Sequence, residues 1–185
     1  MSRTTTIHID LAANSENIQT LRAPLAAHRF MAVVKADAYG HGAVRVAQHI
    51  EPVVDALAVA FTEEAVALRE AGVNAPLLVL EGPHTASDLA LAGTLNLWPV
   101  IHSDAQLEWC KTLGTNLSQV WIKIDTGMHR LGFAAKRYAA IRDTLLSHGI
   151  GEITAMSHLA SAEHPDDAVT QAQLRSWAET VSDGT

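Results

Sequence analysis

The chain has 185 residues, of which 48% are hydrophobic and 18% charged, a composition typical of a globular domain and unlike that of a disordered chain. Its formal net charge of −7 argues against a nucleic-acid or anionic-membrane partner, because both demand a basic surface. The single cysteine, Cys110, excludes an intrachain disulfide and a cysteine-based metal cluster.

Short apolar segments alternate with amphipathic ones along the chain. After an extended arm and a first helix capped by Asp10, strands are predicted at residues 30–34, 56–60, 76–80, 95–101, 120–124 and 153–159. Helices are predicted at residues 42–50, 62–72, 87–92, 103–110, 134–148 and 166–181. This strand–helix alternation predicts right-handed βαβ units and a parallel sheet.

Two α/β architectures fit that alternation. One is an open, doubly wound sheet, and the other is a (β/α)8 barrel, which needs eight strands and about 250 residues. No GxGxxG follows the first strand, which weighs against a dinucleotide-binding version of the open sheet. The alternation by itself does not choose between them.

The first predicted strand ends in a lysine, Lys35. Burying an ammonium inside a strand is costly, but the last side chains of strands in α/β folds point into the ligand site. Tyr39-Gly40-His41-Gly42 then reads as a tight turn whose backbone can approach a ligand closely. Lys35 is therefore either a solvated strand-end lysine or an amine that attacks a carbonyl from a partly dry pocket.

Residues 32–42, Ala-Val-Val-Lys-Ala-Asp-Ala-Tyr-Gly-His-Gly, resemble the pyridoxal 5'-phosphate (PLP) signature of alanine racemases. The resemblance implies that Lys35 binds PLP as an internal aldimine and that Tyr39 contacts the cofactor phosphate. Many members have asparagine where this chain has Asp37. It also implies a (β/α)8 barrel followed by a mostly β domain. With six strand–helix units, residues 1–185 are expected to be an incomplete N-terminal PLP-binding barrel, without the C-terminal β domain.

Two later segments extend the resemblance. Alternation along the fifth strand places Lys123 and Asp125 on one face, where spacing alone also fits a simple Asp-Thr-Gly turn. The resemblance implies that Arg130 lies near the phenolic oxygen of PLP and the substrate carboxylate, which a guanidinium binds bidentately. Lys123 matches a family lysine that is often carbamylated. His158 matches a histidine beside the cofactor ring.

The remaining candidates read as structural. His41 is expected to be solvated or hydrogen-bonded to the backbone, and Cys110 to pack as a small hydrophobe. The histidines show no metal-ligand spacing, so no metal site is predicted.

The resemblance implies PLP-dependent interconversion of L- and D-alanine through a Cα carbanion, with Lys35 as the base on one face. The base on the other face is, in the family, a tyrosine from the β domain of a partner subunit. That tyrosine has no match here, so residues 1–185 alone are expected to have little activity, although the full-length protein is expected to be a homodimer. We expect a cytoplasmic location, since neither a signal peptide nor a membrane-spanning stretch is recognisable.

Two alternatives are open. The nearer one is a single-domain PLP-binding barrel of the homeostasis type, a carrier without racemase activity, which needs no β domain. The more distant one is a non-catalytic α/β module whose lysine is structural. Whichever holds, an incomplete barrel has unpaired edges at its first and sixth strands, and self-association is expected.

Overall fold

The computed structural model describes residues 6–25, 27–113 and 116–182. Its strands form one parallel sheet in the order β1-β2-β3-β4-β5-β6, with β7 also pairing to β5. The strands are β1 (Met31–Val33), β2 (Ala56–Val59), β3 (Leu77–Val79), β4 (Trp98–Ile101), β5 (Gln119–Asp125), β6 (Phe133–Ala134) and β7 (Glu152–Met156).

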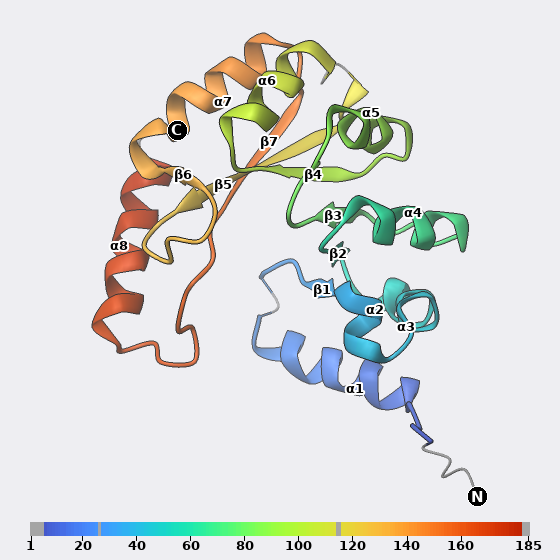
Figure 1. The fold of residues 1–185 in the computed structure, drawn as a ribbon. Coiled ribbons are helices and arrows are strands. Elements are labelled where there is room, and N and C mark those ends of the chain that lie inside the picture. Colours follow the sequence, from blue (N-terminus) through green and yellow to red (C-terminus); the bar gives the residue numbers. More distant parts are fainter. Residues whose placement is uncertain (1–5, 26, 114–115, 183–185) are drawn as a thin grey trace, which may run out of the picture.

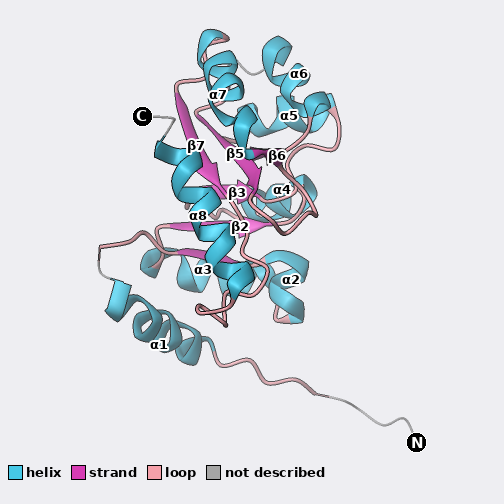
Figure 2. Ribbon diagram, turned by 90° about the vertical axis from the view of Figure 1, so that its left-hand side faces the viewer, coloured by secondary structure: helices cyan, strands magenta, loops and turns pink. Residues whose placement is uncertain are grey.

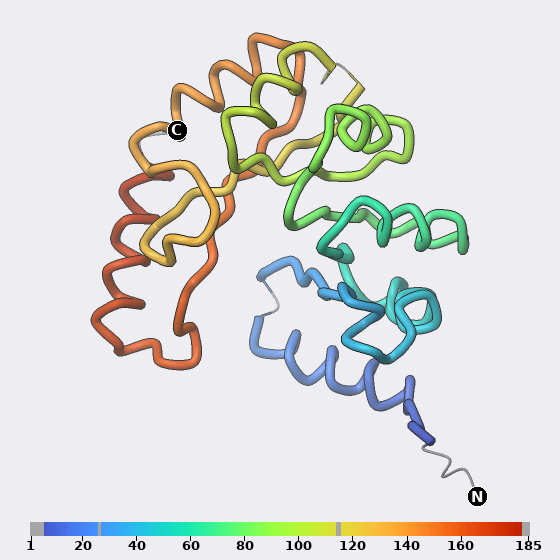
Figure 3. The backbone as a smooth tube through the Cα atoms, viewed as in Figure 1, coloured from blue at the N-terminus to red at the C-terminus, as the bar shows by residue number. Residues whose placement is uncertain are grey.

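A loop joins β5 to β6, whereas helices connect the other successive strands and lie along the outer side of the curved sheet (Figures 1 and 2). They are α1 (Leu11–Arg22), α2 (Lys35–Gly40), α3 (Ala43–Ile50), α4 (Thr62–Glu70), α5 (Ala86–Thr94), α6 (Asp104–Leu113), α7 (Tyr138–Ser147) and α8 (Ala168–Ser182). Short 3-10 helices span Ala23–Leu25, Glu51–Val53 and Ala135–Arg137. Figure 3 traces the chain as it winds around one arc, from α1 at one end to the C-terminal units at the other.

The two faces of the sheet are packed differently. On β5, Val120, Ile122 and Ile124 belong to a large core that includes buried residues of the surrounding helices. Trp121, between them, belongs to a smaller cluster on the inner face. That smaller cluster is made of strand residues and the adjoining Leu80, without a helical side chain: Met31, Ala58, Leu78, Leu80, Trp98, Val100, Trp121 and Met156. Successive strand residues point to opposite faces, so one face packs against helices and the other lines the inside of the arc.

This arrangement decides between the two architectures. A doubly wound sheet carries helices on both faces, whereas the inside of a barrel is filled by strand side chains. The fold is therefore an α/β one of the (β/α)8 type, and it is incomplete because seven strands form an open arc.

Most predicted elements are present, but the helix predicted at residues 134–148 begins only at Tyr138, because residues 133–134 form β6 and Ala135–Arg137 form a 3-10 helix. Helix α4 begins at Thr62, as predicted, with Phe61 as its N-cap. The short strand β6 was not predicted; it adds two residue pairs to the end of β5. At the start of α6, Gln106 donates its N–H to Ser103 Oγ (3.4 Å), and its side chain accepts from the N–H of His102 (2.8 Å). None of the described helices has the length and apolarity needed to cross a membrane.

Candidate functional site

A cavity of about 330 Å3 lies at the carboxyl ends of the strands, within the range of small-molecule sites. Four of the residues singled out from the sequence line it. Lys35 follows β1, Lys123 lies on β5, Arg130 is in the loop after β5, and His158 follows β7. The rest of the lining is Ala60, Leu80, Glu81, Leu131 and Met156. Strand ends far apart in the sequence thus converge at the edge of the barrel where active sites of this architecture occur.

Three cations, Lys35, Lys123 and Arg130, and one carboxylate, Glu81, line this cavity. Lys123 is only 7% exposed. In the part of the chain that the structure describes, the side chains of Lys35, Lys123 and Arg130 make no hydrogen bond or ion pair with another residue. A buried cation is normally paired, so Lys123, with the half-buried Lys35 and the exposed Arg130 beside it, leaves a place for an anionic ligand group.

The pKa values in the cavity follow from that crowding. Burial lowers the pKa of Lys123, Arg130 lowers it further, and Asp125 partly opposes both. Burial also lowers the pKa of His158, with added effects from the charges of Lys123, Arg130 and Lys35. The imidazole of His158 is therefore held toward its neutral form.

Lys35 is followed by a backbone turn of unusual hand. Ala36, Asp37, Ala38 and Tyr39 all have φ between 51° and 54°. The left-handed conformation costs about 1–2 kcal/mol for each residue that has a Cβ, so four in a row must be held by tertiary contacts. The turn predicted at residues 39–42 is the end of a longer reversal that begins directly after Lys35. Alanine rarely adopts this conformation, so the positive φ values of Ala36 and Ala38 could not be predicted from residue type.

Asp37 closes the far end of this turn. Its Oδ1 accepts a hydrogen bond from the N–H of Ala43 (2.7 Å), and its carbonyl oxygen accepts from the N–H of Gly42 (2.9 Å). The amide oxygen of an asparagine can accept the same bond, which accounts for either residue at this position.

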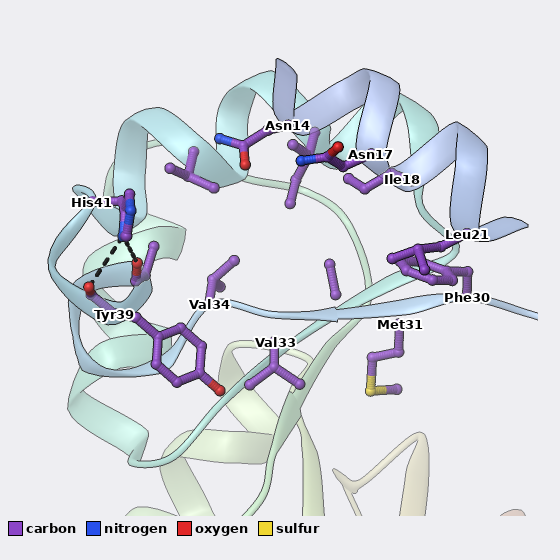
Figure 4. A pocket seen from close by; sticks show the side chains of 14 residues that line it. Asn14, Asn17, Ile18, Leu21, Phe30, Met31, Val33, Val34, Tyr39 and His41 are labelled. Carbon is purple, nitrogen blue, oxygen red and sulfur yellow. Dashed lines mark hydrogen bonds between the residues drawn. The ribbon is translucent and has the colours of Figure 1, made fainter. Parts of the chain in front are cut away.

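Tyr39 is not brought into the cavity of Lys35. It is 60% exposed and lines a neighbouring groove of about 360 Å3, where its ring lies beside Val33 and Val34 (Figure 4). His41 donates from Nδ1 to the carbonyl oxygens of Ala38 (2.9 Å) and Tyr39 (3.1 Å). The prediction of a backbone-bonded histidine at position 41 is confirmed.

The loop that carries Arg130 is organised by Asp125 at the end of β5. The Asp125 carboxylate accepts from the N–H groups of Gly127 and His129 (both 3.0 Å) and from His129 Nδ1 (3.0 Å). Burial acts to raise the pKa of Asp125, but these hydrogen bonds lower it overall. Only glycine fits at position 132, because a Cβ there would lie 2.7 Å from the backbone nitrogen of Asp125.

Gln173 on α8 joins the loop after β5 to the loop after β7. It is 1% exposed. Its Nε2 donates to the carbonyl oxygen of His158 (3.0 Å) and to Thr126 Oγ1 (3.3 Å), and its Oε1 accepts from the N–H of Ala160 (2.9 Å). Sequence analysis missed this residue, because a glutamine inside an amphipathic helix does not show what its amide bonds to.

Comparison with known proteins points to one family. The family model described as "Alanine racemase, N-terminal domain" matches residues 9–184. The chain is 46% identical over 168 residues to an alanine racemase of Pseudomonas entomophila, covering 90% of this chain and 47% of that protein. It is 45% identical over 168 residues to a catabolic alanine racemase of Pseudomonas putida, with the same coverage.

Solved structures agree with these relatives. The biosynthetic alanine racemase of Pseudomonas aeruginosa superposes with a TM-score of 0.80 at 38% identity, covering 92% of this chain and 48% of that one. The alanine racemase of Acinetobacter baumannii gives 0.86 at 29% identity, covering 95% and 50%. The chain spans about half the length of the curated relatives it matches.

Proposed function

Because the chain belongs to the alanine racemase family through its N-terminal domain, we propose that its cavity binds PLP and serves the interconversion of L- and D-alanine. The convergence of Lys35, Lys123, Arg130 and His158 in one cavity supports this proposal most directly. An amine is available for the aldehyde of PLP, and unpaired cations are available for its anionic groups and for a substrate carboxylate.

We propose distinct roles for the residues of this cavity. Bound PLP would supply the electron sink that makes the Cα proton of an amino acid acidic. Lys35 Nζ would hold the cofactor by condensing with its aldehyde, with loss of water, and the free Lys35 amine would take or return that proton on one face. Arg130 would hold the substrate carboxylate through its planar guanidinium. His158, neutral because its pKa is lowered, would lie beside the cofactor ring without adding charge.

Lys123 and Tyr39 have supporting roles in the proposal. The lowered pKa of Lys123 increases its neutral amine fraction, which is the form that adds carbon dioxide to give a carbamate. A carbamate would replace a buried cation by an anion able to orient Arg130. Tyr39 is proposed as the contact to the cofactor phosphate, and among the described residues its hydroxyl has no other hydrogen-bond partner.

A PLP carrier without racemase activity is the second candidate, and one observation favours it for residues 1–185 alone. Neither Tyr39 nor Tyr138 lines the cavity, so the lining offers no tyrosine as base for the opposite face. We propose that such a base comes from a partner subunit of a homodimer. Little D-alanine formed by residues 1–185, together with PLP binding at Lys35, is the result expected from this reasoning.

The test is to incubate the protein with PLP, reduce it with borohydride and map the labelled peptides. We expect the label at Lys35 and a visible absorbance band that Lys35→Ala abolishes. Lys136→Ala, which removes an exposed lysine outside the cavity, is the matched control and should leave the band unchanged. Label spread evenly over the lysines would refute the proposal.

A further inference from the structure

Glu64, on the first turn of α4, joins the ends of two neighbouring strands. Its Oε1 accepts a hydrogen bond from the N–H of Ala36 (2.6 Å), the residue directly after Lys35. Its Oε2 accepts from the N–H groups of Ala60 (2.7 Å) and Phe61 (3.1 Å), which follow β2. One carboxylate therefore receives three backbone N–H groups, two from the chain after β2 and one from the chain after β1.

The Ala36 N–H lies where the backbone changes hand. Lys35 has a negative φ, whereas Ala36 has a φ of 51° and begins the left-handed turn. The far end of the turn is fixed by Asp37 through the N–H of Ala43. Glu64 supplies the corresponding restraint at the near end, beside the lysine. A strained turn of this kind persists only where surrounding contacts over-determine it.

We propose that Glu64 is the positioning residue of Lys35: its carboxylate fixes the start of the left-handed turn against the β2–α4 junction and so directs the lysine side chain into the cavity. This inference rests on the proposed function insofar as Lys35 is the reactive amine. A carboxylate is required, since an amide in its place would set an NH2 group against at least one of the three N–H donors.

The first test needs no cofactor. In Glu64→Gln, the hydrogen-exchange rate of the Ala36 amide, measured by NMR, should rise at least tenfold. Glu63→Gln is the matched control, because it removes the same charge from the same helical turn on an exposed side chain. Equal exchange of the Ala36 amide in Glu64→Gln and Glu63→Gln would overturn the inference and would leave the proposed function untouched.

The second test measures labelling of Lys35 by PLP and borohydride as a function of PLP concentration. Glu64→Gln should lower the limiting rate at Lys35 at least tenfold and change the half-saturating concentration less than twofold. Labelling of the exposed Lys136 is the internal reference and should not change. Wild-type protein that is not labelled at Lys35 would contradict the proposed function, whereas equal rates in wild type and Glu64→Gln would contradict the role of Glu64.

A rescue variant tests the mechanism itself. Ala36 is exposed, and glycine adopts its φ of 51° without the steric cost of a Cβ. Ala36→Gly combined with Glu64→Gln should recover at least a third of the lost labelling rate, whereas no recovery would show that Glu64 does not act through the turn. If Glu64→Gln alone does not fold, the comparison is made between Ala36→Gly and the double variant: the double variant should be labelled more slowly, by up to threefold, and equal rates would overturn the proposal.

Discussion

At the scale of single residues, the cavity is defined by three cations whose side chains make no hydrogen bond or ion pair within the described part of the chain. Lys123 is buried and Lys35 and Arg130 share its cavity, so each positive charge raises the cost of placing another there. The protonation of His158 is the property that reports these charges most directly, because a histidine titrates within the accessible pH range.

We predict that His158 titrates below the ordinary histidine pKa of about 6.5, because burial and the charges of Lys123, Arg130 and Lys35 disfavour its protonated form. Lys123→Met should move this pKa upward, toward the ordinary value. NMR titration of the imidazole, assigned with His158→Gln, measures the shift. Lys136→Met is the control and should leave it unchanged; a pKa of His158 at or above the ordinary value would contradict the prediction.

The lowered pKa of His158 also determines how this residue makes the stability of the protein depend on pH. Since the pKa of His158 is lower in the folded state, the unfolded state binds more protons between the two pKa values, and stability rises with pH there. The contribution of His158 to the free energy of unfolding is therefore zero above the unfolded-state pKa. It becomes destabilising as the pH falls below that value. His158→Gln should remove that part of the pH dependence from urea-unfolding measurements.

At the scale of elements, the loops that carry the candidate residues are tied together by side chains from other elements. Asp125 orders the turn before Arg130, and Gln173 on α8 joins that turn to the chain after β7. The close approach of Gly132 to Asp125 fixes β6 against β5. Helix α8 thus serves the geometry of the cavity without contributing to its lining.

We predict that Gln173→Met destabilises the protein by about 1–3 kcal/mol, because it removes the hydrogen bonds of a buried amide and leaves the N–H of Ala160 and the carbonyl of His158 without their protein partner. Gln171→Met is the matched control: the same substitution on the same helix, at an exposed glutamine, should cost less than about 0.5 kcal/mol. Urea-unfolding midpoints compare the two. Similar stabilities would show that the Gln173 bonds do not hold the loops.

At the scale of the whole molecule, the arc of strands has two free edges. Within the described residues β1 pairs only with β2, and β7 pairs only with β5. Val33 on β1 is 40% exposed, so the edge is apolar as well as unpaired. An open edge of this kind is a template for another strand.

We therefore predict that residues 1–185 self-associate with increasing concentration in sedimentation velocity. Val33→Lys should shift the distribution toward monomer, because a lysine on an edge strand opposes edge-to-edge pairing. Val169→Lys, which adds the same charge at an exposed valine of α8, is the control and should have a smaller effect. A monomer at every concentration tested would contradict the prediction.

The sequence by itself determined the alternation of strands and helices, the placement of Lys35 at a strand end and the family that its flanking residues resemble. These follow from local periodicity and from residue types that stand next to one another. The tertiary structure alone decided that residues 35, 123, 130 and 158 share one cavity while Tyr39 lies outside it. The tertiary structure also decided that Glu64 bonds to the chain after Lys35 and that Gln173 bonds to the chain after β7. Such contacts join residues far apart in the sequence. They depend on how the sheet curves and how the helices pack on it, which no local pattern encodes.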